Sequence, residues 1–177
     1  MNIWLTTDTH FGHDKMLEYC GRPKDHSERI LKALYRIPTE DLIIHLGDVC
    51  IEKDEYWHNC LRNLSNKILI IGNHDRKSYN WYLEHGWKFV AEQFIWNYLG
   101  KRILFSHIPL KNDGQFDINI HGHFHNTLKR MREQKWVTPD EEARNKGVID
   151  ILTPKHKLLA LEFTNYQPVL LKTFLGF

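Results

Sequence analysis

The stretch Ile3-Trp4-Leu5-Thr6-Thr7-Asp8-Thr9-His10 joins a short apolar run to polar side chains. Its first five residues are apolar or β-branched, which is typical of a buried strand, and the polar residues follow where that strand would end. Two further runs have the same form: Leu42 to Leu46 is followed by Gly47-Asp48, and Lys67 to Ile71 by Gly72-Asn73-His74-Asp75. The pattern predicts three buried strands that each end in polar residues.

Amphipathic segments separate these runs. A capping box at Asp25-x-x-Glu28 precedes apolar residues at helical spacing up to Ile37, and a second helix is predicted from Asp54 to Leu64. This alternation predicts parallel strands joined by right-handed crossovers, with the loops after the strands on one edge of the sheet. Ligands bind at that edge in such folds.

The second half of the chain is predicted to be rich in strands. A helix from Ser78 to Glu84 precedes expected strands at 89–96, 101–105, 118–121, 157–163 and 169–174, with a hairpin turn at Gly100-Lys101. Between the third and fourth of these strands, residues 127–157 are predicted only as a loop. We expect one α/β domain over residues 1–177, with two packed mixed β-sheets flanked by helices in a four-layer α/β/β/α sandwich.

Composition limits the class of protein. The 177 residues are 42% hydrophobic and 26% charged with a net charge of +2, and no apolar run could span a bilayer. Three cysteines, Cys20, Cys50 and Cys60, lack metal-type spacing and cannot all pair, which argues against a disulfide framework and a thiolate metal site. Without a secretory signal, a cytoplasmic protein that does not enter a membrane is expected.

Metal-ligating residue types follow the predicted strands. Residues two apart in a strand face the same way, so Asp8 with His10, and His123 with His125, can direct two ligand atoms at one point. Glycines at 47, 72 and 122 would let the backbone bring such ligands close together. The candidates are Asp8, His10, Asp48, Asn73, His107, His123 and His125.

Charge counting favours two metals at this centre. Two divalent cations, offset by Asp8, Asp48 and one hydroxide, leave a charge of about +1 that attracts a phosphate oxyanion. One cation would leave the centre neutral or negative.

In this order, the residues resemble the calcineurin-like metallophosphoesterase superfamily, whose pattern runs Asp-x-His, Gly-Asp, Gly-Asn-His-Asp/Glu, His, Gly-His-x-His. The likeness extends to a small single-domain bacterial and phage subgroup. Its further matching segments are Thr7 to His13, Arg22-Pro23, His45 to Val49, His121 to His123 and Asn165 to Val169.

The resemblance implies roles for individual residues. A first metal would lie on Asp8, His10 and His125, and a second on Asn73, His107 and His123, with Asp48 bridging both. A bridging hydroxide would attack phosphorus while His74 protonates the leaving oxygen. The implied cofactors are two divalent ions, with manganese as the first candidate and iron, zinc, nickel or cobalt as alternatives.

Two departures from this pattern concern specificity. Protein Ser/Thr phosphatases of the superfamily carry Gly-Asp-x-x-Asp-Arg-Gly and a Glu after Asn-His, whereas this chain has Ile51 and Asp75 at those positions. A phosphoprotein phosphatase is therefore disfavoured. The residue that orients His74 must come from elsewhere.

Other polar residues have two interpretations each. His13, Arg22 and His121 are candidate substrate contacts, but a hydrogen-bonded turn, a surface cation and a buried core histidine are the respective alternatives. The basic run from Lys129 to Lys135 could steer nucleic acid or form a solvated face with its neighbouring acids.

The sequence thus predicts a metal-dependent phosphoesterase acting on small or nucleotide-like mono- or diesters. The alternatives are a nuclease or nucleic-acid end-processing phosphatase, and a non-catalytic scaffold of the same fold. The partner is then a phosphate ester, including a nucleotide or nucleic acid, and no oligomeric state is indicated.

Overall fold

A computed structural model describes residues 1–64 and 66–177 and contains two β-sheets. The first has the order β4-β3-β2-β1-β9, in which β1 to β4 are parallel and β9 is antiparallel to β1. The predicted parallel pairing of the first three strands is confirmed. Their bounds are β1 Ile3–Thr6, β2 Leu42–His45, β3 Asn66–Ile70, β4 Phe89–Ala91 and β9 Val169–Leu170.

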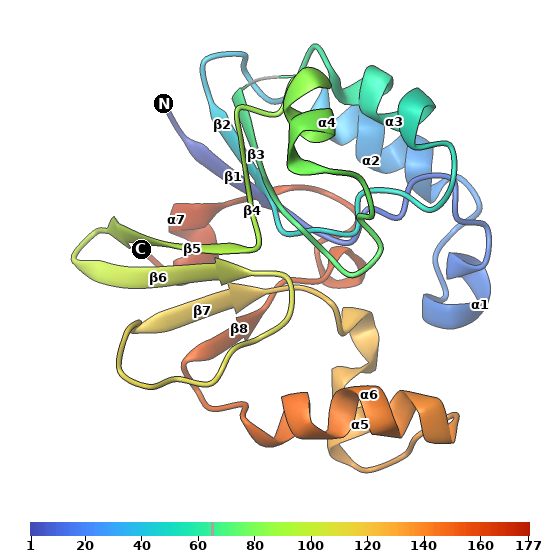
Figure 1. Ribbon diagram of the computed structural model, residues 1–177, viewed down its shortest axis with the longest axis vertical. Coiled ribbons are helices and arrows are strands. Elements are labelled where there is room, and N and C mark those ends of the chain that lie inside the picture. Colours follow the sequence, from blue (N-terminus) through green and yellow to red (C-terminus); the bar gives the residue numbers. More distant parts are fainter. Residues whose placement is uncertain (65) are drawn as a thin grey trace.

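The second sheet has the order β5-β6-β7-β8. Strands β5 (Gln93–Tyr98) and β6 (Lys101–Ser106) form the predicted antiparallel hairpin around Gly100, while β7 (Ile118–His121) and β8 (His156–Leu158) continue in parallel. Both sheets are mixed and they pack against each other with helices alongside (Figure 1). The predicted α/β class is confirmed.

Helices α2, α3 and α4 lie together beside the first sheet, whereas α5 and α6 lie beyond the second sheet (Figure 1). Within the described residues, no helix has the length and apolar character needed to cross a bilayer. The helices are α1 Met16–Cys20, α2 His26–Leu34, α3 Asp54–Leu61, α4 Tyr79–Glu84, α5 Leu128–Arg132, α6 Pro139–Asp150 and α7 Leu171–Leu175, with 3-10 turns η1 His125–Thr127 and η2 Leu161–Phe163.

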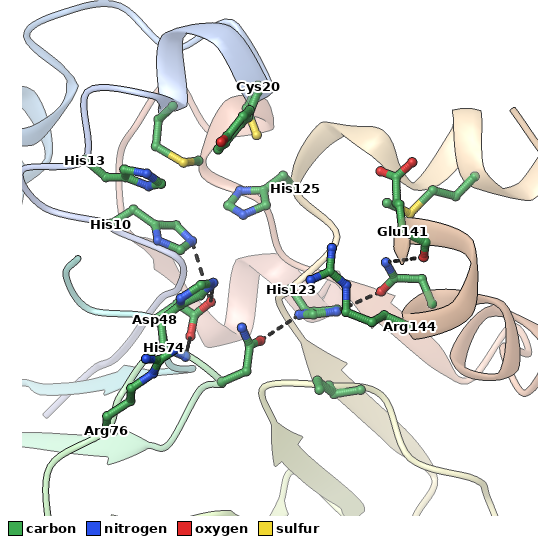
Figure 2. Close-up of a pocket in the computed structure, with 16 residues that line it drawn as sticks. His10, His13, Cys20, Asp48, His74, Arg76, His123, His125, Glu141 and Arg144 are labelled. Carbon is green, nitrogen blue, oxygen red and sulfur yellow. Dashed lines mark hydrogen bonds and ion pairs between the residues drawn. The ribbon is translucent and has the colours of Figure 1, made fainter. Parts of the chain in front are cut away.

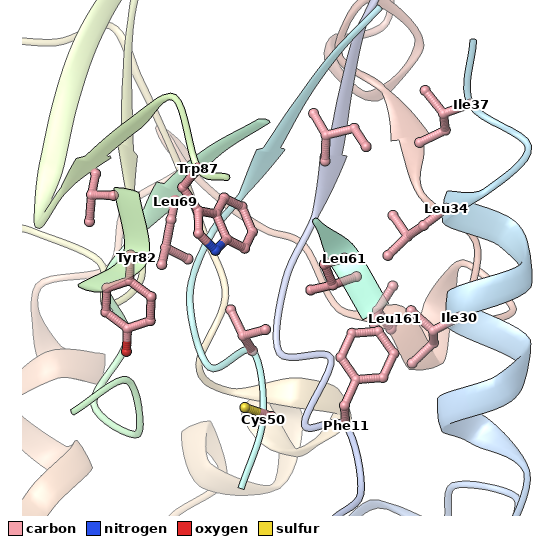
Figure 3. Packing of buried hydrophobic residues seen from close by; sticks show 13 residues of the cluster. Phe11, Ile30, Leu34, Ile37, Cys50, Leu61, Leu69, Tyr82, Trp87 and Leu161 are labelled. Carbon is pink, nitrogen blue, oxygen red and sulfur yellow. The ribbon is translucent and has the colours of Figure 1, made fainter. Parts of the chain in front are cut away.

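Alternation along the strands of the first sheet divides the core into two layers. Ile43 and Leu69 face the helices and pack in a cluster with Leu34, Tyr82 and Trp87. Figure 3 labels the last four of these residues. Their neighbours in the strands point the other way. Ile44 and Ile70 join residues of the second sheet, such as Phe105 and Ile120, in the layer between the sheets. This double burial explains the nearly continuous apolar runs in the sequence.

Three of the expected strands were wrong in extent. The segment 89–96 divides at Glu92 into β4 and β5, which belong to different sheets. The segment 157–163 is a strand only as far as Leu158 and then forms η2. The segment 169–174 becomes α7 after Leu170, because Leu171 is buried and Phe174 and Leu175, at helical spacing from it, pack between the sheets.

Two local predictions about helices were also wrong. Residues 127–157, predicted as a loop, contain α5 and the twelve-residue helix α6. The capping box before α2 does not form, because the Asp25 carboxylate accepts a hydrogen bond from Arg29 and gives no cap to the helix. Ser78 does cap α4, through a hydrogen bond from the backbone N–H of Trp81.

The buried imidazole of His58 makes stability sensitive to acid. Its Nδ1 accepts a hydrogen bond from Trp87 at 2.9 Å, and burial lowers its pKa to about 3. The unfolded chain binds a proton below about pH 6.5 and the folded chain does not. The contribution of the neutral His58 to the free energy of unfolding is therefore complete above pH 6.5. It is lost as pH falls towards 3, by about 1.4 kcal/mol for each pH unit.

We expect His58→Gln, which keeps an acceptor for Trp87, to reduce the loss of unfolding free energy between pH 6.5 and 4.5. Urea unfolding of both proteins across this range measures the difference. Equal pH slopes for the variant and the parent protein would show that His58 is not buried in the neutral form.

Candidate metal centre

The candidate ligands meet where the strands of both sheets end (Figure 2). Asp8 follows β1, Asp48 follows β2 and Asn73 follows β3. His107 follows β6, and the turn after β7 supplies His123 and His125. Because parallel strands present their carboxyl ends at one edge, this topology brings together residues that are far apart in the sequence.

Asp8, His10 and His125 form one group. Nε2 of His10 and Nε2 of His125 lie 3.9 and 3.7 Å from Oδ1 of Asp8. One donor atom from each of the three residues lies within 4.8 Å of the other two, so all three atoms can contact the same cation. Asp8 and His10 thus lie together as expected, although both have positive φ and lie beyond β1, so strand geometry is not the reason. The expectation that His123 and His125 direct two atoms at one point was wrong, because only His125 belongs to this group and His123 lies beside Asn73.

A second group surrounds the side-chain oxygen of Asn73. This Oδ1 atom lies 3.0 Å from Nε2 of His107 and 3.0 Å from Nδ1 of His123. Asp48 lies between the two groups, since its Oδ2 atom is 3.4 Å from His107 and 3.6 Å from His10. The centre therefore offers two adjacent sets of donors with one carboxylate between them.

Hydrogen bonds on the outer side of three imidazoles fix which nitrogen faces the centre. In the neutral form of each ring, the outer nitrogen that faces an acceptor carries the proton, so the inner nitrogen is the one whose lone pair is available to a cation. The acceptors are Leu46 O for Nδ1 of His107 at 2.8 Å, Asn145 Oδ1 for Nε2 of His123 at 3.0 Å, and Glu162 Oε1 for Nδ1 of His125 at 3.2 Å.

The backbone is strained at most of these positions. Positive φ angles occur at Asp8, His10, Asp48, His123 and His125, with values from 43° to 72°. A non-glycine residue in the left-handed region costs about 1–2 kcal/mol. Other non-glycine residues, such as Leu99 and Gln134, also have positive φ, but the grouping of five at one centre supports the hypothesis that the fold holds this geometry for a function.

Two glycines permit the close approach of the loops. A Cβ atom on Gly72 would overlap Oδ1 of Asp48, and one on Gly122 would overlap Oδ2 of Asp8. Any larger residue at either position would displace a carboxylate from the centre. The glycines were predicted to let the loops approach closely, and the reason is that each lies against the carboxylate of a candidate ligand.

The carboxylates make the centre attractive to positive charge. Burial alone would lower the pKa of His107, but the neighbouring Asp48 carboxylate raises it to about 9. Burial would likewise lower the pKa of His125, and the Asp8 carboxylate raises it to about 10. A cation between these groups is therefore stabilised. Two carboxylates, four imidazoles and one amide oxygen form a donor set that suits first-row divalent metals.

A family model for calcineurin-like phosphoesterases matches residues 1–167. The chain belongs to this family. The calcineurin-like phosphoesterases bind divalent metals, and the grouped histidines and aspartates of this phosphoesterase are able to hold one.

Relatives of this phosphoesterase include proteins of similar size. The uncharacterized protein MJ1445 of Methanocaldococcus jannaschii is 27% identical over 180 residues, which cover 94% of this chain and 85% of that protein. The protein of unknown function AQ665 from Aquifex aeolicus has the same fold, with a TM-score of 0.67, 22% identity and coverage of 97% of this chain and 96% of that chain. A novel archaeal phosphodiesterase aligns over 70% of this chain and 73% of its own, with 21% identity and a TM-score of 0.47.

His74 lies at the open side of the phosphoesterase centre. Its side chain is 40% exposed, with Nε2 4.0 Å from Oδ2 of Asp48, while its backbone N–H donates to Oδ1 of Asp48 at 2.8 Å. The ring also packs edge-on against His10 at a centroid distance of 5.5 Å. These contacts with Asp48 and His10 hold His74 beside the candidate ligands. They take the place of the aspartate that protein phosphatases of the superfamily carry where this chain has Ile51.

Asp75 ties two ligand loops together. Its buried carboxylate accepts hydrogen bonds from the backbone N–H groups of Asp48, Val49 and Gly72 at 2.7–3.0 Å. The last residue of the Gly-Asn-His-Asp block therefore holds the Asp48 loop in register with the loop of Asn73.

Arg22 lies behind the centre and not in the pocket, contrary to the expectation of a substrate contact. Its side chain is fully buried and donates to Glu162 at 2.7 Å and to the backbone oxygen of Thr9 at 3.1 Å. Glu162 also accepts from His125. Burial alone would raise the pKa of Glu162, but His125 and Arg22 lower it to about 2. Arg22 thus supports the residue that orients His125.

The other two candidate contacts differ from each other. His13 lines the pocket beside His10, where a substrate can reach it. His121 is buried, with Nδ1 3.0 Å from the backbone oxygen of Gly122, and does not line the pocket. Cys20, His125 and Glu162 each have a possible metal-binding atom within 4.8 Å of those of the other two. The spacing of the cysteines in the sequence does not predict this grouping.

Two supporting residues were missed in the sequence. Glu162 lies in a segment predicted as a strand, and no local pattern distinguishes it. Asn145 lies on α6, whose start has a recognisable signal: Thr138 caps the helix through the N–H of Glu141, and Pro139 is the first helical residue. That signal predicts the helix but not the contact of Asn145 with His123.

Proposed function

We propose that this phosphoesterase hydrolyses small phosphate mono- or diesters at a centre that holds two divalent ions. The observation that carries the proposal is the convergence of seven donor side chains in two adjacent groups around Asp48. In their neutral forms, His107, His123 and His125 would turn a lone pair towards the centre, because the outer nitrogen of each ring faces an acceptor.

The two groups suggest how the ions would be held. Asp8, His10 and His125 would bind one ion, and Asn73, His107 and His123 the other, with Asp48 shared. The buried Nδ1 atom of His10 has no hydrogen-bond partner among the described residues. A metal ion bound to Nε2 would orient this ring without a partner on Nδ1. Manganese is the first candidate, with iron, zinc, nickel or cobalt as alternatives.

When bound, two divalent ions lower the pKa of water and neutralise charge on a phosphate group. The protein's own residues then complete the reaction. The exposed imidazole of His74, in its protonated form, donates its ring proton to the departing ester oxygen. His13 faces the same space and is placed to contact the phosphate oxygens. The leaving group therefore departs as an alcohol and not as an alkoxide.

Ion pairs neutralise two of the cations in the basic run from Lys129 to Lys135. Within the basic run, Arg130 binds both carboxylate oxygens of Glu141, and Lys135 pairs with Glu133 at 2.7 Å. These contacts neutralise part of the charge that could steer nucleic acid. The basic run therefore gives the nuclease alternative less support than the sequence alone suggested.

A screen of activity with different metals tests the proposal. The purified protein is assayed with Mn²⁺, Ni²⁺ and Zn²⁺ on bis-p-nitrophenyl phosphate, p-nitrophenyl phosphate, cyclic nucleotides and short single-stranded DNA. We expect metal-dependent hydrolysis of the small esters. Faster cleavage of DNA would favour a nuclease, and absence of turnover with every metal while two ions bind would favour a scaffold.

Asn145 offers a prediction about metal affinity. Its amide donates to the backbone oxygen of Glu141 at 3.0 Å, which turns Oδ1 towards Nε2 of His123. Asn145→Leu removes this acceptor, and we expect metal affinity to fall about 10–100-fold, as is usual when such a supporting residue is lost. Asn145→Asp keeps the acceptor and serves as the control. Isothermal titration with Mn²⁺ measures both, and an unchanged affinity of Asn145→Leu would contradict the role of Asn145.

A further inference from the structure

The pocket over the centre is larger than one phosphate group requires. Its volume is about 670 Å³, within the range of pockets that bind whole small molecules. One wall comes from α1, which contributes Met16 and Tyr19, and the opposite wall comes from α6, which contributes Arg144 and Asn145. Figure 2 shows His74 beside Asp48 on one side of the centre and Arg144 beside His123 on the other.

Free positive charge lines this pocket. Arg76 and Arg144 are exposed at its surface, and neither guanidinium group has a hydrogen bond or ion pair with any described residue. The pocket also contains Glu141, whose pKa is lowered by its bond to Arg130 and, more weakly, by the charge of Arg144. Arg130 and the backbone N–H of Val137 already occupy its carboxylate, so Glu141 does not form an ion pair with Arg144. A ligand with a single negative charge would leave these arginines unneutralised.

The backbone that carries Arg144 is fixed relative to the centre on both sides. The next residue, Asn145, is 7% exposed and bonds to His123. Three residues earlier in the helix, Glu141 is held by Arg130 of α5. Arg144 therefore extends from a fixed point beside the candidate ligand His123, with its guanidinium free to bind an anion.

We propose that Arg144 binds a second phosphate group of the substrate, so that the enzyme prefers phosphate esters carrying two phosphates, such as nucleoside bisphosphates or diphosphates. The assignment rests on the proposed function, because the first phosphate is the one placed at the metal centre. The exposed ring of Tyr19, 5.9 Å from the ring of His13, gives the pocket an aromatic wall against which a base can stack.

Ligands that cannot be hydrolysed test the assignment by binding alone. The probes are thymidine 5′-phosphonate, thymidine 3′,5′-bisphosphonate and thymidine 5′-methylenediphosphonate, titrated calorimetrically into the Mn²⁺-loaded protein. The last two distinguish a second group on the sugar from one in a diphosphate chain. We expect at least one of them to bind about tenfold or more tightly than the monophosphonate.

Arg144→Gln should reduce this preference to less than about threefold while leaving monophosphonate binding nearly unchanged. Lys146→Gln is the matched control, because Lys146 lies on the same helix but outside this pocket, paired with Glu142 at 3.2 Å. Absence of any binding, absence of a preference in the parent protein, or a preference that survives in Arg144→Gln would overturn the assignment. Hydrolysis of bis-p-nitrophenyl phosphate in the same preparations reports separately on the proposed function.

Discussion

His74→Asn should lower kcat for an alkyl phosphodiester by about 10²–10⁴-fold, the usual contribution of a positioned general acid. An alkoxide is a poor leaving group and depends on the proton from His74. A p-nitrophenolate leaves readily without a proton, so the loss for bis-p-nitrophenyl phosphate should be much smaller. Steady-state kinetics on the two esters measure this difference.

The side chain of His74 is 40% exposed, and its backbone bond to Asp48 is independent of the imidazole. The variant should therefore fold and bind metal as the parent protein does, which thermal unfolding and metal analysis verify. His13→Asn is a useful comparison, because His13 also lines the pocket but would affect both esters alike. Equal losses for both esters in His74→Asn would exclude its role as the acid.

Asp48→Asn should abolish the shared site and reduce kcat/KM by about 10³-fold or more, since several kcal/mol of charge stabilisation depend on the ions. The substitution keeps the shape of the side chain but removes its negative charge. Burial alone would raise the pKa of Asp48, yet His107 and His10 hold it below the usual range, so the native side chain is ionised. Inductively coupled plasma mass spectrometry should find at most one ion per chain.

Asp25→Asn provides the control for a change of charge, because Asp25 is an exposed residue paired with Arg29 at 2.8 Å. It should retain two ions and full activity. If Asp48→Asn kept both ions and the parent activity, Asp48 could not be the shared ligand.

The parts of the fold that could be predicted have local causes. The first three strands are buried on both faces, so their apolar runs are continuous and end abruptly at polar residues. The C-terminal segment shows where this reasoning fails. The apolar residues from Val169 to Leu175 suit a strand by composition. The segment forms α7 from Leu171 because Leu171 and Leu175, four residues apart, both pack between the sheets.

The candidate centre divides in the same way. Its candidate ligands could be predicted because each follows a strand, and the parallel order of strands brings these ends together. The residues that support the ligands could not. Asn145 and Glu162 reach His123 and His125 from segments 22 and 37 residues away, by contacts that depend on how α6 and η2 pack. Arg22 was misassigned because a buried arginine with a carboxylate partner has no distinctive local pattern.

The most direct test of the two-metal centre is a titration of metal-free protein with Mn²⁺, in which bound metal and hydrolysis of bis-p-nitrophenyl phosphate are measured in the same samples. Two ions should bind per chain, and activity should appear only as the second ion binds. Full activity with one ion per chain, or two bound ions without hydrolysis under any condition, would contradict a dinuclear phosphoesterase.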